Sequence, residues 1–180
     1  MHQPNRQQHV NTQRGHPTPA CDLKLLVLDV DGVLTDAGIY LAEDGTETKR
    51  FNARDGIAIK RLLNSGFEVG FLTSSMNEAL VRRRAQMIGV ERVSCGRTPK
   101  LPRLQAWCDE LEIEMSAVAY IGDDVNDLEV IERCGLTACP ADAVSRIKKM
   151  AHFTLHTPGG YGCVREFIED FLAEECGLVL

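Results

Sequence analysis

The feature that most constrains the fold is a four-residue apolar run, Leu25–Leu28, that leads directly into Asp29, Asp31 and Gly32. A short run that is apolar at every position is typical of a strand buried on both faces, as in a parallel sheet. Alternate residues of a strand share a face, so we expect both carboxylates at the carboxyl end of this strand, where open α/β sheets bind ligands. Two such charges are unfavourable unless a cation or a proton accompanies them. A polar turn is the alternative.

The rest of the chain alternates between strand and helix patterns. Further core strands are predicted at residues 68–73, 91–95, 117–121, 136–139 and 152–155, and helices at 53–65, 77–88, 100–111, 127–134, 141–150 and 162–174. Asp44-Gly45 between two strand-like runs, 39–42 and 46–51, predicts a hairpin. Residues 21–180 are therefore predicted to form one α/β domain: a doubly wound parallel sheet with helices on both faces and a small β-hairpin inserted after the first strand.

Composition indicates which partners and which cellular compartment are expected for this domain. Residues 1–20 are polar, and we expect a disordered tail without the apolar core of a signal peptide. The net charge of −6 argues against nucleic acid or an anionic membrane as the main partner, and no apolar run reaches membrane-spanning length. Seven cysteines without a C-x-x-C pair are typical of a reducing compartment, so a cytoplasmic protein is predicted.

Polar residues stand at comparable places in the other strand–helix units. Thr73 ends the second core strand, Lys100 opens a helix, and Asp123 and Asp124 follow the strand at 117–121. Clustered carboxylates suit Mg²⁺, and a carboxylate can also attack phosphorus as a nucleophile. A lysine and a hydroxyl beside it would hold the oxygens of a transferring phosphoryl group. The pattern predicts phosphoryl-transfer chemistry.

Four segments resemble, in order, the motifs of the haloacid dehalogenase (HAD) superfamily: Asp29-Val30-Asp31-Gly32-Val33, Thr73, Lys100 and Gly122–Asp127. The resemblance implies that Asp29 is the nucleophile and Asp31 the general acid and base. It implies an Mg²⁺ site made by Asp29, the Asp31 carbonyl and Asp123. Asp124 and Asp127 would support that site, and Thr73 and Lys100 would hold the phosphoryl group.

The spacing of these motifs leaves no room for a cap domain. Members of the superfamily usually carry a cap after the first or second motif. Here the predicted hairpin and one helix fill the stretch between Asp29 and Thr73, and a helix and a strand fill the stretch between Thr73 and Lys100. Because a small-substrate phosphatase must control water at its site, we expect another subunit to serve as the lid.

A narrower resemblance covers about residues 23–172. Segments 29–36, 51–56, 120–124 and 159–166 are similar to the 3-deoxy-D-manno-octulosonate 8-phosphate (KDO 8-phosphate) phosphatase family. That likeness implies a capless homotetramer in which neighbouring subunits complete each site. It also implies a phosphomonoesterase that releases phosphate from a keto-sugar acid through an aspartyl-phosphate. The implied substrate-binding residues are Arg54, Ser74, Gly159, Gly160 and Arg165, with the segment 159–165 gating the site.

One departure from the family pattern concerns the substrate. Where the family usually has Thr-Gly-Arg, this chain has Thr73-Ser74-Ser75, which removes a planar anion partner. Arg82, Arg83 or Arg84 is a candidate replacement, in a run similar to that of 2-keto-3-deoxynononate 9-phosphate phosphatases. Two alternatives therefore stay open: a phosphatase for a nonulosonate 9-phosphate, and a non-catalytic oligomeric binding domain. The intact carboxylates weigh against the second.

Overall fold

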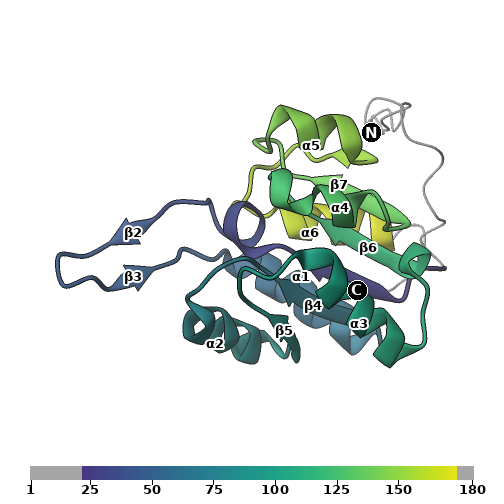
Figure 1. Cartoon of the computed structure of the whole chain (residues 1–180), viewed down its shortest axis with the longest axis horizontal. Helices are drawn as coiled ribbons and strands as arrows, with labels where there is room; N and C mark the ends of the chain where they lie inside the picture. The colour runs from purple at the N-terminus through teal and green to yellow at the C-terminus, as the bar shows by residue number, and fades with distance from the viewer. Residues whose placement is uncertain (1–21, 174–180) are drawn as a thin grey trace, which may run out of the picture.

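The computed structural model describes residues 22–173, and a six-stranded parallel sheet forms its centre (Figure 1). The strand order is β5-β4-β1-β6-β7-β8. The strands are Leu25–Leu28 (β1), Glu68–Leu72 (β4), Arg92–Ser94 (β5), Val118–Ile121 (β6), Leu136–Cys139 (β7) and Phe153–Thr154 (β8). The helices are Ala53–Asn64 (α1), Glu78–Ile88 (α2), Lys100–Leu111 (α3), Leu128–Ile131 (α4), Ser145–Met150 (α5) and Cys163–Phe167 (α6), which continues as a wider turn over Ile168–Ala173. The predicted doubly wound α/β sheet is confirmed.

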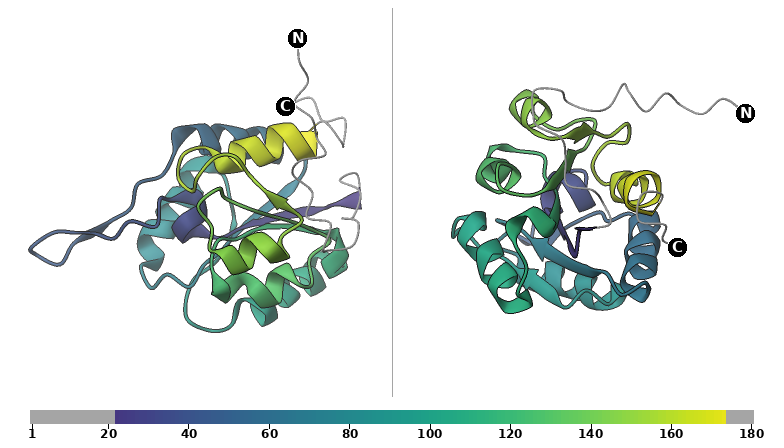
Figure 2. Two further views of the ribbon diagram at one scale, coloured as in Figure 1. Left: turned by 90° about the horizontal axis from the view of Figure 1, so that it is seen from above. Right: turned by 90° about the vertical axis from the view of Figure 1, so that its right-hand side faces the viewer.

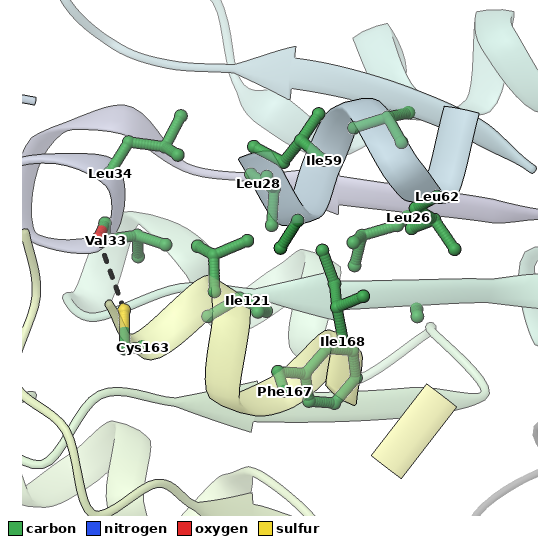
Figure 3. Close-up of a cluster of buried hydrophobic side chains, with 14 of the residues drawn as sticks. Leu26, Leu28, Val33, Leu34, Ile59, Leu62, Ile121, Cys163, Phe167 and Ile168 are labelled. Carbon is green, nitrogen blue, oxygen red and sulfur yellow. Dashed lines mark hydrogen bonds between the residues drawn. The ribbon is translucent and has the colours of Figure 1, made fainter. Parts of the chain in front are cut away.

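Helices cover both faces of the sheet, which explains the unbroken apolar run of β1. Leu26 and Leu28 belong to a hydrophobic cluster with residues of α1, α2 and α6, whereas Leu25 and Val27 belong to one with residues of α3, α4 and α5. The right-hand view of Figure 2 shows these two sets of helices on opposite sides of the sheet. Figure 3 shows the first cluster, with α1 and α6 closing over β1. Every side chain of β1 is therefore buried, and a polar residue at any of these positions would lie in the core.

Local sequence signals set the helix ends. The Asn52 side chain caps α1 by accepting a hydrogen bond from the Arg54 amide at 2.9 Å. Asn77 caps α2 in the same way through the Leu80 amide, and α2 ends at Gly89, whose φ of 82° is left-handed. Asparagine before a helix and glycine after it are the residues that best satisfy the free amides and carbonyls there.

A two-stranded antiparallel hairpin, β2 (Tyr40–Leu41) and β3 (Glu47–Thr48), lies between β1 and α1. It extends away from the body of the molecule (Figure 1). Its strands are shorter than the runs predicted from the sequence. Between β1 and β4 the described chain holds only this hairpin and α1 beside short turns, and between β4 and α3 it holds α2 and β5. The predicted absence of a cap domain follows from this order.

Two expectations need correction or fall outside the described residues. The helix predicted at 141–150 begins only at Ser145, because residues 140–143 form a turn and Val144 is extended, with its amide donating to the Asp123 carbonyl at 3.0 Å. The loop that delays the helix thus contacts the Asp123 backbone. The predicted tail, residues 1–20, and the predicted end of the last helix at residue 174 lie outside the described part of the chain.

The strand order reverses direction at β1, since β4 pairs with one edge of β1 and β6 with the other. In doubly wound sheets the carboxyl ends of the strands at this point form the binding crevice. Asp29, Thr73 and Asp123 follow β1, β4 and β6 at this edge. None of the helices within residues 22–173 has the length and apolar character needed to cross a membrane.

Candidate active site

The loop after β1 brings its two aspartates to the edge of the sheet by a turn, and not by continuing the strand. The turn Val30–Leu34 starts directly after Asp29, and Gly32 has a φ of 93°. A Cβ at Gly32 would lie 2.0 Å from Asp123 Oδ2, so glycine is required for the close approach of the two loops. Asp29 is buried and Asp31 partly exposed. Both residues lie beyond the carboxyl end of β1 and line one hollow, but Asp31 belongs to the turn and not to a continued strand as we expected.

Lys100 lies between two buried carboxylates. Its Nζ is 2.9 Å from Asp29 Oδ1 and 2.5 Å from Asp127 Oδ1, and it also contacts the Tyr120 hydroxyl at 3.4 Å. An ammonium has three hydrogens, and three oxygens surround this one. Burial lowers the pKa of Lys100, but the charges of Asp29 and Asp127 more than offset this and hold the pKa above its usual value. Lys100 therefore stays charged and neutralises part of the acidic cluster.

The acidic cluster carries more negative charge than Lys100 can balance. Oxygens of Asp29, Asp123 and Asp127 lie within 4.8 Å of one another. Burial raises the pKa of Asp29 above its ordinary range despite the Lys100 ammonium. Burial also raises the pKa of Asp123, and the negative charges of Asp29 and Asp127 add to the effect. The ionised forms of both groups are thus unfavourable without a further cation.

Two oxygens of this cluster fit a metal ion. Among the described residues, Asp123 Oδ1 is buried without a hydrogen-bond partner, and Asp29 Oδ1 has the Lys100 ammonium, 2.9 Å away, as its neighbour. Asp127, in contrast, is satisfied, because its Oδ2 accepts the Asp123 and Asp124 amides at 3.0 and 3.3 Å. Clustered carboxylate oxygens that no amide or hydroxyl occupies are ligands that Mg²⁺ favours. Asp31 contributes no carboxylate to this cluster.

A hollow of about 410 Å³ opens beside the cluster. This volume is large enough for a small ligand. Its lining comes from the loops after β1, β4 and β6: Asp29, Asp31, Ala37, Thr73, Ser74, Ser75, Asp123, Asp124, Val125 and Asn126. Asn126 Nδ2 donates to Ser74 Oγ at 3.3 Å, which joins two of the loops. The predicted residues of the sheet edge therefore surround one space, with Lys100 and Asp127 buried behind it.

Thr73 is held by its neighbours, and within residues 22–173 no acceptor takes its hydroxyl hydrogen. Its Oγ1 accepts the Ser75 amide at 3.0 Å. Its carbonyl accepts the Arg103 guanidinium, with Nη1 at 3.1 Å. Sequence reasoning missed Arg103, although its position one helical turn after Lys100 was a usable signal, because residues i and i+3 share a helix face. Arg103 supports the loop after β4 from behind.

Lys49, also missed, pairs with Asp31. Its Nζ lies 2.6 Å from Asp31 Oδ1 and 3.1 Å from Glu47 Oε1. No signal in the sequence connects the two residues, since the hairpin lies between them and its geometry alone brings Lys49 back to the sheet edge. Asp124, predicted as a supporting residue, caps the short turn that starts the α4 segment by accepting the Val125 amide.

The predicted substrate-binding residues outside the sheet edge do not line the hollow. Arg54 is exposed on the first turn of α1, and the Arg165 side chain pairs with Glu169 at 2.9 Å. A Cβ at Gly159 would lie 1.9 Å from the Gly32 carbonyl oxygen, so this glycine packs against the backbone of the loop after β1. The Gly160 amide donates to the Val33 carbonyl at 2.9 Å.

The same carbonyl accepts the Cys163 thiol at 3.3 Å, as Figure 3 shows. Within one chain, the segment 159–165 thus supports the loop after β1 through several backbone contacts. Its role in gating the site stays a prediction.

The three consecutive arginines of α2 also point elsewhere. Arg82 and Arg83 line a separate hollow between α2 and β5, and Arg82 pairs with Glu78 at 2.6 Å. Arg84 Nη2 donates to the Asn52 carbonyl at 3.0 Å, beneath the start of α1. Within one chain, none of the three lines the hollow at the sheet edge. The arginine absent after Thr73 is therefore not replaced from α2 of the same chain.

Comparisons with known proteins agree with this geometry. The family model for haloacid dehalogenase-like hydrolases matches residues 92–165. The chain is 40% identical over 149 residues to the 3-deoxy-D-manno-octulosonate 8-phosphate phosphatase KdsC of Salmonella typhi, covering 83% of this chain and 79% of that protein. It is 39% identical over 145 residues to the KdsC of Escherichia coli K12, covering 81% and 77%.

Solved structures of proteins with the same name also resemble this chain. The 3-deoxy-D-manno-octulosonate 8-phosphate phosphatase of Yersinia pestis aligns with a TM-score of 0.85 at 32% identity, over 94% of both chains. That of Moraxella catarrhalis, solved with a magnesium ion, a phosphate ion and KDO, aligns with a TM-score of 0.84 at 33% identity, over 89% of this chain and 91% of the other.

Proposed function

The chain belongs to the family of 3-deoxy-D-manno-octulosonate 8-phosphate phosphatases among the haloacid dehalogenase-like hydrolases, and on that premise we propose that it hydrolyses this sugar phosphate to KDO and phosphate with Mg²⁺ as cofactor. The observation that carries the proposal is the buried pair of carboxylates Asp29 and Asp123 at the edge of an open hollow, where Lys100 pairs with Asp29 and Asp123 Oδ1 has no partner among the described residues. A pure binding domain has no need of such a pair, which is unfavourable without a cation.

Asp29 and Asp123 would hold the Mg²⁺ ion through these oxygens, together with the Asp31 carbonyl, while Asp124 and Asp127 order the loop around Asp123. When bound, Mg²⁺ neutralises the phosphate and the carboxylates that face it. Without that neutralisation a phosphate dianion would meet at least two carboxylates. Asp127 would not need to coordinate, because all its oxygens already accept hydrogen bonds or the Lys100 ion pair.

In the first half of the reaction, one Asp29 carboxylate oxygen attacks phosphorus while the bond from phosphorus to the sugar oxygen breaks. Asp31 gives its proton to that leaving oxygen. Thr73, whose hydroxyl hydrogen meets no acceptor within the described residues, donates to a phosphoryl oxygen, and Lys100 balances the charge of Asp29. In the second half, water attacks phosphorus and gives a proton to Asp31, and the bond from phosphorus to Asp29 breaks. Phosphate leaves and both carboxyl groups return to their starting state.

The assembled protein is proposed to be a homotetramer whose neighbouring subunits close the site. Ile39 and Leu41 of the hairpin are 83% and 67% exposed, and such a projecting apolar surface is unfavourable in water. A second copy of the chain would cover it. This assembly would also give Arg54 and the segment 159–165 a substrate to contact, in a neighbouring subunit. We further propose a cytoplasmic location, since the five cysteines of the described region are all free thiols.

Phosphate release with Mg²⁺ over a substrate panel tests the proposal. The panel comprises KDO 8-phosphate, a nonulosonate 9-phosphate, glucose 6-phosphate and 4-nitrophenyl phosphate. We expect a kcat/KM for KDO 8-phosphate at least about 10²-fold above the others. A preference for the nonulosonate 9-phosphate would mean that the replacement of Thr-Gly-Arg by Thr73-Ser74-Ser75 has changed the substrate of the enzyme. No release from any substrate, with folded and Mg²⁺-loaded protein, would reject the phosphatase in favour of a binding domain.

A further inference from the structure

Lys49 lies outside the motifs of the sequence, yet it holds the carboxylate of Asp31. It follows β3, the hairpin strand that returns to the body of the molecule (Figure 1). Its side chain is only 7% exposed, and its ammonium lies between Asp31 Oδ1 at 2.6 Å and Glu47 Oε1 at 3.1 Å. Burial lowers the pKa of Lys49, but the hydrogen bonds that it donates to Asp31 and Glu47 more than offset this and raise the pKa above its ordinary value. The ammonium is therefore a fixed, charged donor.

One short, charged donor reaches the Asp31 carboxylate. Lys49 Nζ donates to Oδ1 at 2.6 Å, whereas the Thr35 hydroxyl lies 3.5 Å from that oxygen and has a nearer acceptor in the Val30 carbonyl at 3.3 Å. Among the described residues, the hydrogen bonds to the Asp31 side chain all end on Oδ1, and Asp31 lines the hollow. A short charged donor on Oδ1 favours one orientation of the carboxyl group, which leaves Oδ2 as the oxygen that exchanges protons in the hollow.

The backbone around Lys49 is held in register with the Asp31 loop. Thr35 and Phe51 form an antiparallel bridge, which joins the base of the hairpin to the loop after β1. An ordinary exposed salt bridge would add little to stability, and burying a lysine to form one is unfavourable. The arrangement is better explained by orientation of Asp31 than by stability.

We propose that Lys49 is a positioning residue for the proton transfers of Asp31, an inference that rests on the proposed phosphatase function. Lys49 does not touch the substrate. It fixes Asp31 Oδ2 toward the oxygen that leaves with the sugar and then toward the attacking water. Its loss should matter most when the leaving oxygen needs a proton.

The test compares two leaving groups in Lys49→Met. The sugar alkoxide of KDO 8-phosphate needs a proton to leave, whereas the phenolate of 4-nitrophenyl phosphate does not. For KDO 8-phosphate we expect kcat to fall about 10²-fold with KM nearly unchanged, which is the range of general acid catalysis. The first-turnover burst of nitrophenolate, which reports attack by Asp29, should stay within about 3-fold of wild type.

Three further variants separate positioning from structural damage. Lys49→Arg keeps a charged donor and should restore most of the kcat for the sugar phosphate. Lys60→Met removes an exposed lysine of α1 and should leave the rates on both substrates unchanged. In an Asp31→Asn background, Lys49→Met should reduce the kcat no further, because both act through one group. Should Lys49→Met fail to fold, Lys49→Gln takes its place, because it removes the charge but keeps a polar side chain. We expect its kcat also to fall more for KDO 8-phosphate than its burst rate falls for 4-nitrophenyl phosphate.

Equal loss on both substrates in a folded variant would overturn the positioning role, as would additive losses with Asp31→Asn. An undiminished rate on KDO 8-phosphate would overturn it as well. Failure of the proposed function is distinguishable from all of these, because it would appear as absence of phosphate release in the wild-type protein.

Discussion

The Lys100 ammonium lies 2.9 Å from Asp29 Oδ1, and both side chains are almost completely withdrawn from solvent. The carboxylates keep Lys100 charged there, and Lys100 offsets part of the cost of ionising the buried Asp29. Removing one partner of a buried ion pair leaves an uncompensated charge in the interior, and the penalty is about 3–5 kcal/mol. This relationship makes Lys100 as important for the fold of the site as for its chemistry.

Lys100→Met should therefore lower the free energy of unfolding by about 3 kcal/mol, because it removes the cation that faces the buried Asp29 and Asp127 side chains. Urea unfolding of the metal-free protein measures this. Lys60→Met, at an exposed position, should change the free energy of unfolding by less than about 0.5 kcal/mol. A Lys100→Met effect as small as that of the control would mean that the ion pair contributes nothing.

Asp29→Asn should reduce phosphate release about 10³-fold or more, because an amide oxygen does not form the acyl phosphate. The fold should remain, since the Lys100 pair with Asp127 is unaffected. Phosphate release and circular dichroism, measured on the same sample, separate the two effects. Activity within about 10-fold of wild type would remove Asp29 as the nucleophile.

The sequence was sufficient for the sheet, because β1 is apolar at every position and the carboxyl ends of parallel strands meet at one edge. The same rule placed Asp29, Thr73 and Asp123 together, and the family resemblance added Lys100. Lys49 could not be found, since a hairpin carries it back to Asp31 and no spacing rule describes that path. The late start of α5 was equally inaccessible, because a backbone contact from Val144 to Asp123 overrides the local helix pattern.

Mg²⁺ should stabilise the wild-type protein through the carboxylate oxygens of Asp29 and Asp123. At a Mg²⁺ concentration about 100 times Kd, the gain in the free energy of unfolding is about 2.7 kcal/mol. Asp123→Asn should lose most of this gain in thermal unfolding and in titration calorimetry. Asp109→Asn removes an equal charge from an exposed position on α3 and should keep it. Equal gains in the two variants would exclude Asp123 as a ligand.

Ile39→Asp together with Leu41→Asp should dissociate the proposed tetramer, because a charge at a buried interface is unfavourable. Light scattering coupled to size exclusion measures the change in mass. Thr46→Asp adds a charge to an exposed polar residue of the hairpin and should leave the assembly intact. A wild-type monomer, or a tetramer that survives the double substitution, would contradict an assembly made through the hairpin.

Asp55 should make stability depend on pH outside the metal cluster. It is buried at the start of α1, where its Oδ1 accepts the Arg165 amide at 2.9 Å and its Oδ2 has no partner among the described residues. Burial raises the pKa of Asp55 from 3.8 to about 6, despite the hydrogen bonds from the start of α6. A raised pKa in the folded state means that the folded protein binds this proton more tightly than the unfolded chain. The stabilising contribution is present below about pH 4 and is lost as the pH rises through about 6.

Asp55→Asn keeps the acceptor for Arg165 and cannot ionise, so the difference in unfolding free energy between the variant and wild type isolates this one group. From about pH 4 to about pH 7.5 that difference should move in favour of the variant by at most about 3 kcal/mol, the equivalent of the pKa shift. Urea unfolding across this range measures it. The contributions of Asp29 and Asp123 are common to both proteins and cancel in the difference. A difference that is flat with pH would show that Asp55 titrates in the folded protein as it does in the unfolded chain.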